Sequence, residues 1–134
     1  MALNYSTTLR NAQLDAVETT VGTSAKLYIR TGAKPTACAD ADSGSLLATL
    51  DLPSDWMAAA SSGSKAKNGT WTGTGSGAGT AGHFRIKDSG GTTCHLQGSI
   101  TATSGGGDME LDNTVIAVSQ AITISTFTLT AGNA

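Results

Sequence analysis

Apolar residues recur at every second position in several short segments, the spacing typical of strands with one buried face. In residues 25–32, Leu27 and Ile29 share one face, and polar side chains occupy the other. In residues 46–52, Leu46 and every second residue after it face the same side. Both segments are therefore predicted to be strands at the surface of a β-rich core.

Residues 83–87 and 92–100 alternate in the same way on either side of a glycine-containing turn, which predicts a β-hairpin. The alternation directs Cys94 toward the core. It directs His83 and His95 toward solvent.

The C-terminal segment, residues 121–132, is predicted to be a long strand. Its apolar positions change face between Ile124 and Phe127, so a bulge or a strand buried on both faces is expected near Ser125. Residues 108–112 predict a further short strand.

One helix is predicted, over residues 9–21, after an N-terminal arm of residues 1–8. Ser6 or Thr7 can cap it, and Gly22 can end it. Its polar face consists of Asn11, Asp15 and Glu18. Its apolar side consists of Leu9, Ala12, Ala16, Val17 and Val21. Such a narrow, alanine-rich side suits packing against a sheet or a second subunit.

These elements together predict a single domain over residues 1–134, mainly β, with residues 25–131 forming the β body. We expect an antiparallel β-sandwich or small barrel, jelly-roll-like, with the N-terminal α-helix packed on it.

Composition supports a β-rich fold and limits the partners. Gly, Ala, Ser and Thr make up more than half of the 134 residues, only 13% are charged, and the net charge is −2. No basic patch, signal peptide or long apolar run is apparent, so we expect neither nucleic acid nor a membrane as a partner. Cys38 and Cys94 fit neither a disulfide scaffold nor a zinc module; free thiols and a bridge formed after release from the cell both remain open.

The glycine-rich run at residues 69–82 resembles a phosphate-binding loop only in composition. Such a loop precedes a helix and carries a lysine, whereas this run leads into the strand at residues 83–87. We therefore expect residues 73–82 to form a flexible, exposed loop that orders against a neighbouring subunit.

Candidate catalytic groups are few. His83 and His95 are the only imidazoles, and no nucleophile motif accompanies them. Asp108, Glu110 and Asp112 alternate on one strand and suit a loose cation site or a hydrolase, although a charged outer face is the simpler interpretation. We expect no enzyme activity, no cofactor, no metal and no small-molecule substrate.

Aromatic and basic residues offer two further candidate surfaces. Lys65 and Lys67 precede Trp71 and could contact a nucleic acid strand. Trp56, Met57 and Trp71 are of types enriched at protein interfaces, although a core position is more typical of a Trp in a chain with so few aromatic residues.

Four segments carry a resemblance across most of the chain: "LRNAQLDAVETTVGTSAKLYIRTG", "LATLDLPSDWMAAASSGSKAKNGTW", "GHFRIKDSGGTTCHLQG" and "ITISTFTLTAG". In these segments the chain resembles small virion proteins of tailed bacteriophages, of the capsid decoration or cement type. The resemblance implies synthesis in the host bacterial cytoplasm, a final place on the capsid surface and the major capsid protein as partner. It also implies self-association, a trimer before a dimer.

The candidate interface residues are Ala2, Leu3, Tyr5, Leu9, Val17, Trp56, Met57, Trp71, Gly75 and Gly77. The alternative function is a tail- or fibre-associated module that binds a host surface receptor.

Overall fold

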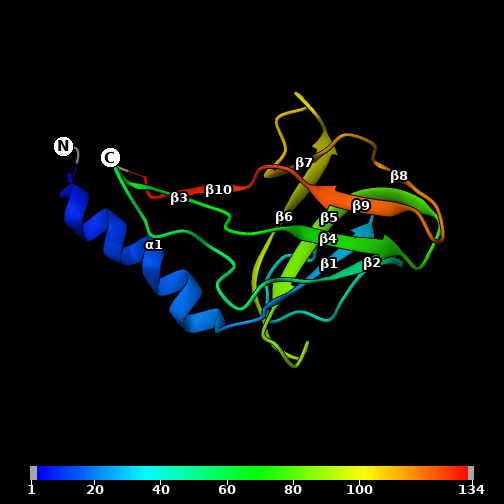
Figure 1. Ribbon diagram of the computed structural model, residues 1–134, viewed down its shortest axis with the longest axis horizontal. Coiled ribbons are helices and arrows are strands. Elements are labelled where there is room, and N and C mark those ends of the chain that lie inside the picture. Colours follow the sequence, from blue (N-terminus) through cyan, green and yellow to red (C-terminus); the bar gives the residue numbers. More distant parts are fainter. Residues whose placement is uncertain (1–2, 133–134) are drawn as a thin grey trace.

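The computed structural model describes residues 3–132, which form one strongly curled sheet with the helix and a two-stranded ribbon extending from one side (Figure 1). The elements are α1 (Thr7–Val21), β1 (Lys26–Thr31), β2 (Leu46–Asp51), β3 (Ser64–Ala66), β4 (Trp71–Gly75), β5 (Gly79–Lys87), β6 (Cys94–Ala102), β7 (Met109–Leu111), β8 (Val115–Ile116), β9 (Ala121–Ile124) and β10 (Thr128–Thr130).

The main sheet has the strand order β7-β6-β5-β1-β2-β4-β9, and β8 pairs with the start of β5. Every pair is antiparallel except β6 with β7. The two strands at the ends of this order, β7 and β9, approach each other, so the sheet is a nearly closed barrel. The predicted fold class, mainly β with one N-terminal helix, is confirmed.

Alternation of apolar and polar residues predicts the buried face correctly where strands pair regularly. Leu27, Ile29 and Phe84 lie inside the barrel, as predicted. In β2, Leu47 is buried and Leu46 is partly exposed, so the predicted face is wrong at the start of this strand. The cause is a register shift between Ile29 and Arg30: these residues pair with Ala48 and Leu46, so Leu47 is an extra residue and the alternation is broken ahead of Ala48.

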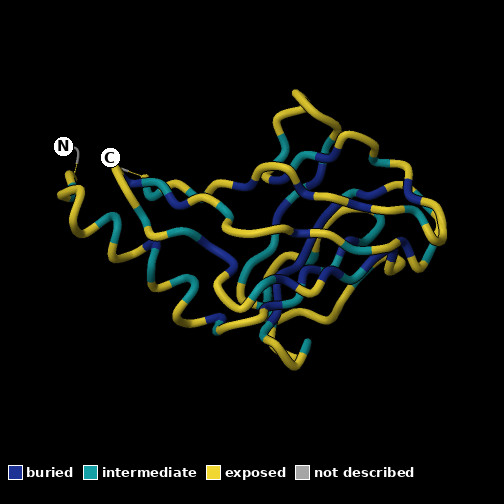
Figure 2. Tube along the Cα trace, viewed as in Figure 1, coloured by how far each residue is buried: buried dark blue, intermediate teal, exposed yellow. Residues whose placement is uncertain are grey.

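All four Trp and Phe side chains join in one core cluster. Ring centroids lie 6.0 Å apart for Trp56 and Trp71, 5.6 Å for Trp71 and Phe127, and 5.6 Å for Phe84 and Phe127. Both indole N–H groups are paired: Trp56 donates to the Gly22 carbonyl and Trp71 to the Asn68 carbonyl. Buried segments accordingly meet in the middle of the molecule, and exposed ones run along its loops and helix (Figure 2).

The predicted single long strand over residues 121–132 is wrong: the chain forms two short strands, β9 and β10, and the first one ends where a bulge was expected. Ile122 and Ile124 of β9 are buried in the barrel wall. After residue 124 the chain leaves the main sheet, and β10 pairs with β3 in a separate ribbon. The change of apolar face therefore marks the transfer of the chain from one sheet to another.

Helix α1 begins at Thr7, two residues before the predicted start. Ser6 caps it by accepting a hydrogen bond from the Leu9 N–H, and the Gly22 N–H closes it on the Glu18 carbonyl. The structure describes no helix with the length and apolar character needed to span a bilayer.

The helix packs through the side predicted to be polar. Asn11 accepts from the Gly63 N–H, Asp15 from the Ala60 N–H, and Glu18 from the Met57 N–H. Leu14 and Val21 complete the buried side. The predicted apolar side is wrong for Leu9, Ala12 and Ala16, which are exposed. The reason is that the opposite, polar side faces the segment before β3, where its three side chains accept hydrogen bonds from backbone N–H groups.

Lys65 of β3 is the charged centre of this contact. Its Nζ lies 2.7 Å from Asp15 Oδ1 and 3.2 Å from Glu18 Oε2, and its side chain is buried. The ammonium group of Lys65 is therefore paired with carboxylates of the helix, which argues against the nucleic acid contact considered for Lys65 and Lys67.

Replacing Lys65 with alanine is expected to lower the free energy of unfolding by about 2 kcal/mol, since two partly buried carboxylates lose their cation. Amide hydrogen exchange should also accelerate in α1 more than in β1 or β5. Lys34→Ala, which removes a lysine from an exposed position, is the control. Unchanged exchange in α1 of the Lys65 variant would show that the helix does not depend on this contact.

The glycine-rich segment is not a flexible loop. Of residues 73–82, which were predicted to form the loop, residues 73–75 belong to β4 and residues 79–82 to β5, and residues 76–78 connect the two strands. A Cβ added at Gly75 would overlap the Ala117 carbonyl oxygen, and one at Gly82 would overlap that of Gly32. The glycines are therefore needed where backbones pack against each other closely.

Candidate functional site

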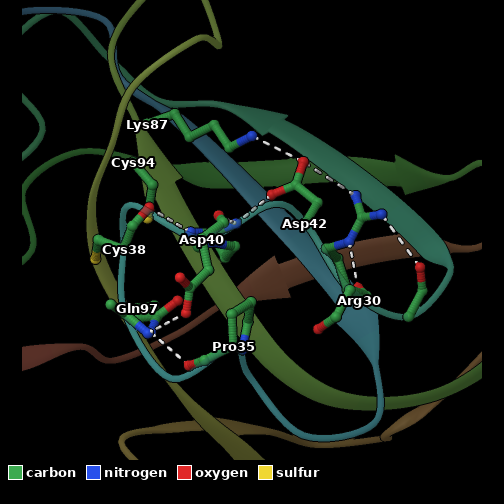
Figure 3. Close-up of polar contacts among 12 residues, drawn as sticks. Arg30, Pro35, Cys38, Asp40, Asp42, Lys87, Cys94 and Gln97 are labelled. Carbon is green, nitrogen blue, oxygen red and sulfur yellow. Dashed lines mark hydrogen bonds and ion pairs between the residues drawn. The ribbon is translucent and has the colours of Figure 1, made fainter.

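The largest polar cluster lies on the outer face of the barrel, under the loop of residues 32–45 that connects β1 and β2 (Figure 3). Residues 83, 85 and 87 alternate on this face of β5, and the loop folds back over them. We call the ionic group formed by Arg30, Asp42, Arg85 and Lys87 the Arg85 cluster.

Arg85 holds the loop of residues 32–45 against β5 through hydrogen bonds. Its Nη2 donates to the Cys38 carbonyl at 2.6 Å, and its Nη1 donates to the Asp40 carbonyl at 3.1 Å and to the Asp42 carboxylate. The side chain is 1% exposed. An arginine in this position satisfies loop carbonyls that would otherwise lack donors.

Asp42 is the anion that the three cations share. Lys87 Nζ lies 2.8 Å from its carboxylate, Arg85 also pairs with it, and Arg30 Nη1 lies 3.8 Å away. Burial alone would raise the pKa of Asp42, but hydrogen bonds from Lys87 and Arg85 outweigh burial and hold that pKa below its ordinary value. A carboxylate held ionised in this way acts as a structural clamp and is poorly suited to proton transfer at neutral pH.

The two histidines are not brought together as a pair of reactive groups. His83 is fully buried, which corrects its predicted exposure: it does lie on the outer face, but the loop covers it, and its Nδ1 donates to the Gly32 carbonyl at 2.9 Å. His95 is exposed, as predicted. Ser99 lies opposite His83 in the β5–β6 pairing, but the hydrogen bond that His83 makes within residues 3–132 goes to the Gly32 carbonyl, and its Nε2 has no partner there.

The acidic residues near β7 hold a loop in place. Asp108 accepts from the Ser99 N–H and hydroxyl, and Glu110 accepts from the N–H groups of Ser104 and Gly106. These bonds close the short connection that returns the chain parallel to β6. Among the described residues there is no group of three or more His, Cys, Asp or Glu side chains arranged to hold a metal ion.

Four of the ten predicted interface residues are at least partly exposed and come from the N-terminal arm and the helix. Leu3 and Leu9 are exposed, and Tyr5 and Val17 are half-buried. Ala2 lies outside the described residues. Val17 lines a groove of about 290 Å³ between α1 and β6, together with Ala16 and Leu96.

Of the other five candidates, four are buried and cannot contact a partner. Trp56, Met57 and Trp71 are fully buried. Their assignment to an interface is wrong, because these side chains pack in the core and the two indole rings belong to the aromatic cluster. Gly75 is also buried, against the chain at Ala117, whereas Gly77 is half-exposed in the turn after β4.

The Arg85 cluster was missed in the sequence, although a signal was present. His83, Arg85 and Lys87 alternate on one strand, and a strand face with three basic or titratable groups calls for a counter-ion. Asp40 and Asp42 supply carboxylates in the connection between the strands predicted at residues 25–32 and 46–52.

Comparisons with known proteins add no relative: no family model, no curated protein and no solved structure matches this chain.

Proposed function

We propose that this chain is a structural protein that joins two protein surfaces through its opposite ends, as a decoration or cement protein on the outside of a bacteriophage capsid. The observation that carries the proposal is the placement of the exposed large apolar side chains. Among the described residues these are Leu3, Leu9, Leu46, Val115 and Val118, between 37% and 62% exposed. Leu3 and Leu9 lie before and at the start of α1, and Leu46, Val115 and Val118 lie in or next to β2 and β8; α1 and β8 are at opposite ends of an elongated molecule (Figure 1).

The first end, which we call the N-terminal end, contains Leu3 and Leu9. It projects from the barrel beside the β3–β10 ribbon, and both termini lie there (Figure 1). Exposed leucines on a projecting helix start are suited to insertion between the subunits of another assembly. This end fits the expected arm and helix contact.

The second end, which we call the barrel end, contains Leu46, Val115 and Val118. The turn of residues 76–78 joins them into one surface: the Ser76 N–H donates to the Leu47 carbonyl, and the Ser119 N–H donates to the Gly75 carbonyl. The glycine-rich segment therefore contributes a fixed backbone surface beside three apolar side chains. A rigid surface loses little conformational freedom on binding.

The sequence resemblance supplies the class of partner, the major capsid protein, together with further copies of this chain. A capsid presents many copies of one surface, so two modest contacts per molecule suffice for stable attachment through avidity. The weakly charged, hydroxyl-rich exterior is compatible with packing beside many neighbours. Association of the free protein into trimers, measured by light scattering, would agree with the expected self-contact.

The double variant Leu3→Asp and Leu9→Asp is expected to reduce binding to undecorated heads of the encoding phage at least tenfold, because two charges would enter an apolar contact. Ser125→Asp, which adds a charge at an exposed position between β9 and β10, should bind normally. Binding is measured by co-sedimentation, with thermal unfolding of each variant as the folding control. Normal attachment of the double variant, or antibody labelling at the tail instead of the head, would contradict the proposal.

A further inference from the structure

Two thiols from distant parts of the sequence meet at the edge of the loop of residues 32–45. Cys38 belongs to this loop and Cys94 is the first residue of β6. Both line the same pocket of about 320 Å³, which also contains Arg85 and Thr92. Figure 3 shows them side by side.

A register shift places Cys94 there. β6 is irregular opposite Ile86 and Lys87, so that Cys94 pairs with Lys87 and its side chain turns to the outer face of the sheet. The predicted core position of Cys94 is therefore wrong, and the thiol is half-buried beneath the loop. Regular alternation would have separated the two sulfur atoms by the thickness of the sheet.

The backbone around Cys38 in the loop is held in place by three hydrogen bonds. Arg85 Nη2 binds the Cys38 carbonyl, the Ala37 N–H donates to the Asp40 carboxylate at 2.8 Å, and Gln97 Nε2 donates to the Pro35 carbonyl at 2.8 Å. These contacts come from β5, from the loop itself and from β6. The thiols are thus kept together by neighbours that do not depend on a covalent bond.

We propose that Cys38 and Cys94 form an intramolecular disulfide when the protein leaves a reducing environment, and that this bond fastens the loop of residues 32–45 to β6. The proposal does not rest on the proposed function. A thiol–disulfide couple such as oxidised glutathione is the oxidant.

The reaction proceeds by two exchanges. The Cys94 thiol loses its proton and attacks one sulfur of oxidised glutathione, which releases one glutathione. The Cys38 sulfur then loses its proton and attacks Cys94 in the mixed disulfide, which releases the second glutathione. Two protein thiols are oxidised by two electrons, and one oxidised glutathione is reduced to two thiols.

The environment of Cys38 assigns the order of these steps. Burial, and then the neighbouring Cys94 thiol, raise the pKa of Cys38 to about 11, so Cys38 remains a thiol at neutral pH. Arg85 lines the same pocket as Cys94, so a positive charge lies near the attacking sulfur. Cys94 therefore attacks first and Cys38 resolves the mixed disulfide.

The bond would close a covalent loop of about 55 residues and so restrict the unfolded chain. We expect oxidation to raise the midpoint of thermal unfolding by roughly 5–15 °C for a chain of this size. The gain should disappear when a reducing agent is added.

The test is incubation of the purified protein with a glutathione redox buffer, followed by thiol counting, mass spectrometry of the intact chain and peptide mapping without reduction. The expected result is a monomer that has lost both thiols and two hydrogen atoms, with a peptide that joins Cys38 to Cys94. Cys38→Ser should retain a glutathione adduct on Cys94 and show no rise in the unfolding midpoint.

Two outcomes would overturn the proposal. One is persistence of both thiols, or stable glutathione adducts on both, in folded wild-type protein under the oxidising buffer. The other is a disulfide that forms only between two chains. Both are read on the wild-type protein, so they decide the matter even if the serine variant fails to fold.

Discussion

Replacing Gly82 with alanine is expected to lower the free energy of unfolding by about 3 kcal/mol, because the new methyl group would meet backbone that has no room to give. Gly82 lies in β5 where the pairing with β1 shifts register. Its added Cβ would overlap the Gly32 carbonyl oxygen and lie 2.8 Å from the Gly32 amide nitrogen. Moving Gly32 would also disturb the bond that His83 donates to the same carbonyl.

The matched control is Gly90→Ala, in the turn between β5 and β6. Its added Cβ would lie 3.6 Å from the nearest atom, the Thr92 hydroxyl oxygen, which is an ordinary contact. Its stability should stay within about 0.5 kcal/mol of wild type. Urea unfolding followed by tryptophan fluorescence measures both variants, and equal midpoints would contradict the close backbone packing of the glycine-rich segment.

Replacing Asp42 with alanine should cost about 3 kcal/mol, because buried Arg85 and largely buried Lys87 would lose their shared counter-ion. The Arg85 bonds to the Cys38 and Asp40 carbonyls would remain, so the variant should fold with a loosened loop. Asp51→Ala is the control: Asp51 forms an exposed ion pair with Lys26, and its loss should cost less than about 1 kcal/mol.

Acid should reduce the difference between wild type and the Asp42 variant. The folded-state pKa of Asp42 is lowered, so its stabilisation is fully present above the ordinary carboxyl pKa of about 4 and is lost as the pH falls through the folded-state pKa. Denaturant unfolding at a series of pH values measures the difference. A constant difference between neutral pH and strong acid would show that Asp42 does not act through its charge.

Local patterns in the sequence predicted the parts of the fold that depend on neighbouring residues. Leu27 and Ile29 identified β1, and the alternation around Phe84 identified the β5–β6 hairpin. The change of apolar face before Phe127 was interpreted as a bulge within one strand, whereas it marks the end of β9. In β1 and in the hairpin, the side chains that carry the pattern pack on the core within regularly paired strands.

The remaining features arise from contacts between segments far apart in the sequence. Nothing local shows that the loop of residues 32–45 folds over His83 and Arg85, or that Lys65 meets Asp15 across fifty residues. The predicted apolar side of the helix is wrong at Leu9, Ala12 and Ala16 for this reason, since much of the helix contact is made by polar side chains to backbone N–H groups, whereas Val17 and Val21 do pack on the core. The glycine-rich segment was misinterpreted because close backbone contact leaves no apolar pattern.

Electron cryomicroscopy of the intact virion tests the proposed docking most directly. We expect copies of this chain on the outside of the head, with Leu3 and Leu9 against one protein surface and Val115 and Val118 against another. Particles that lack the chain, or that hold it with both apolar ends in solvent, would contradict that expectation.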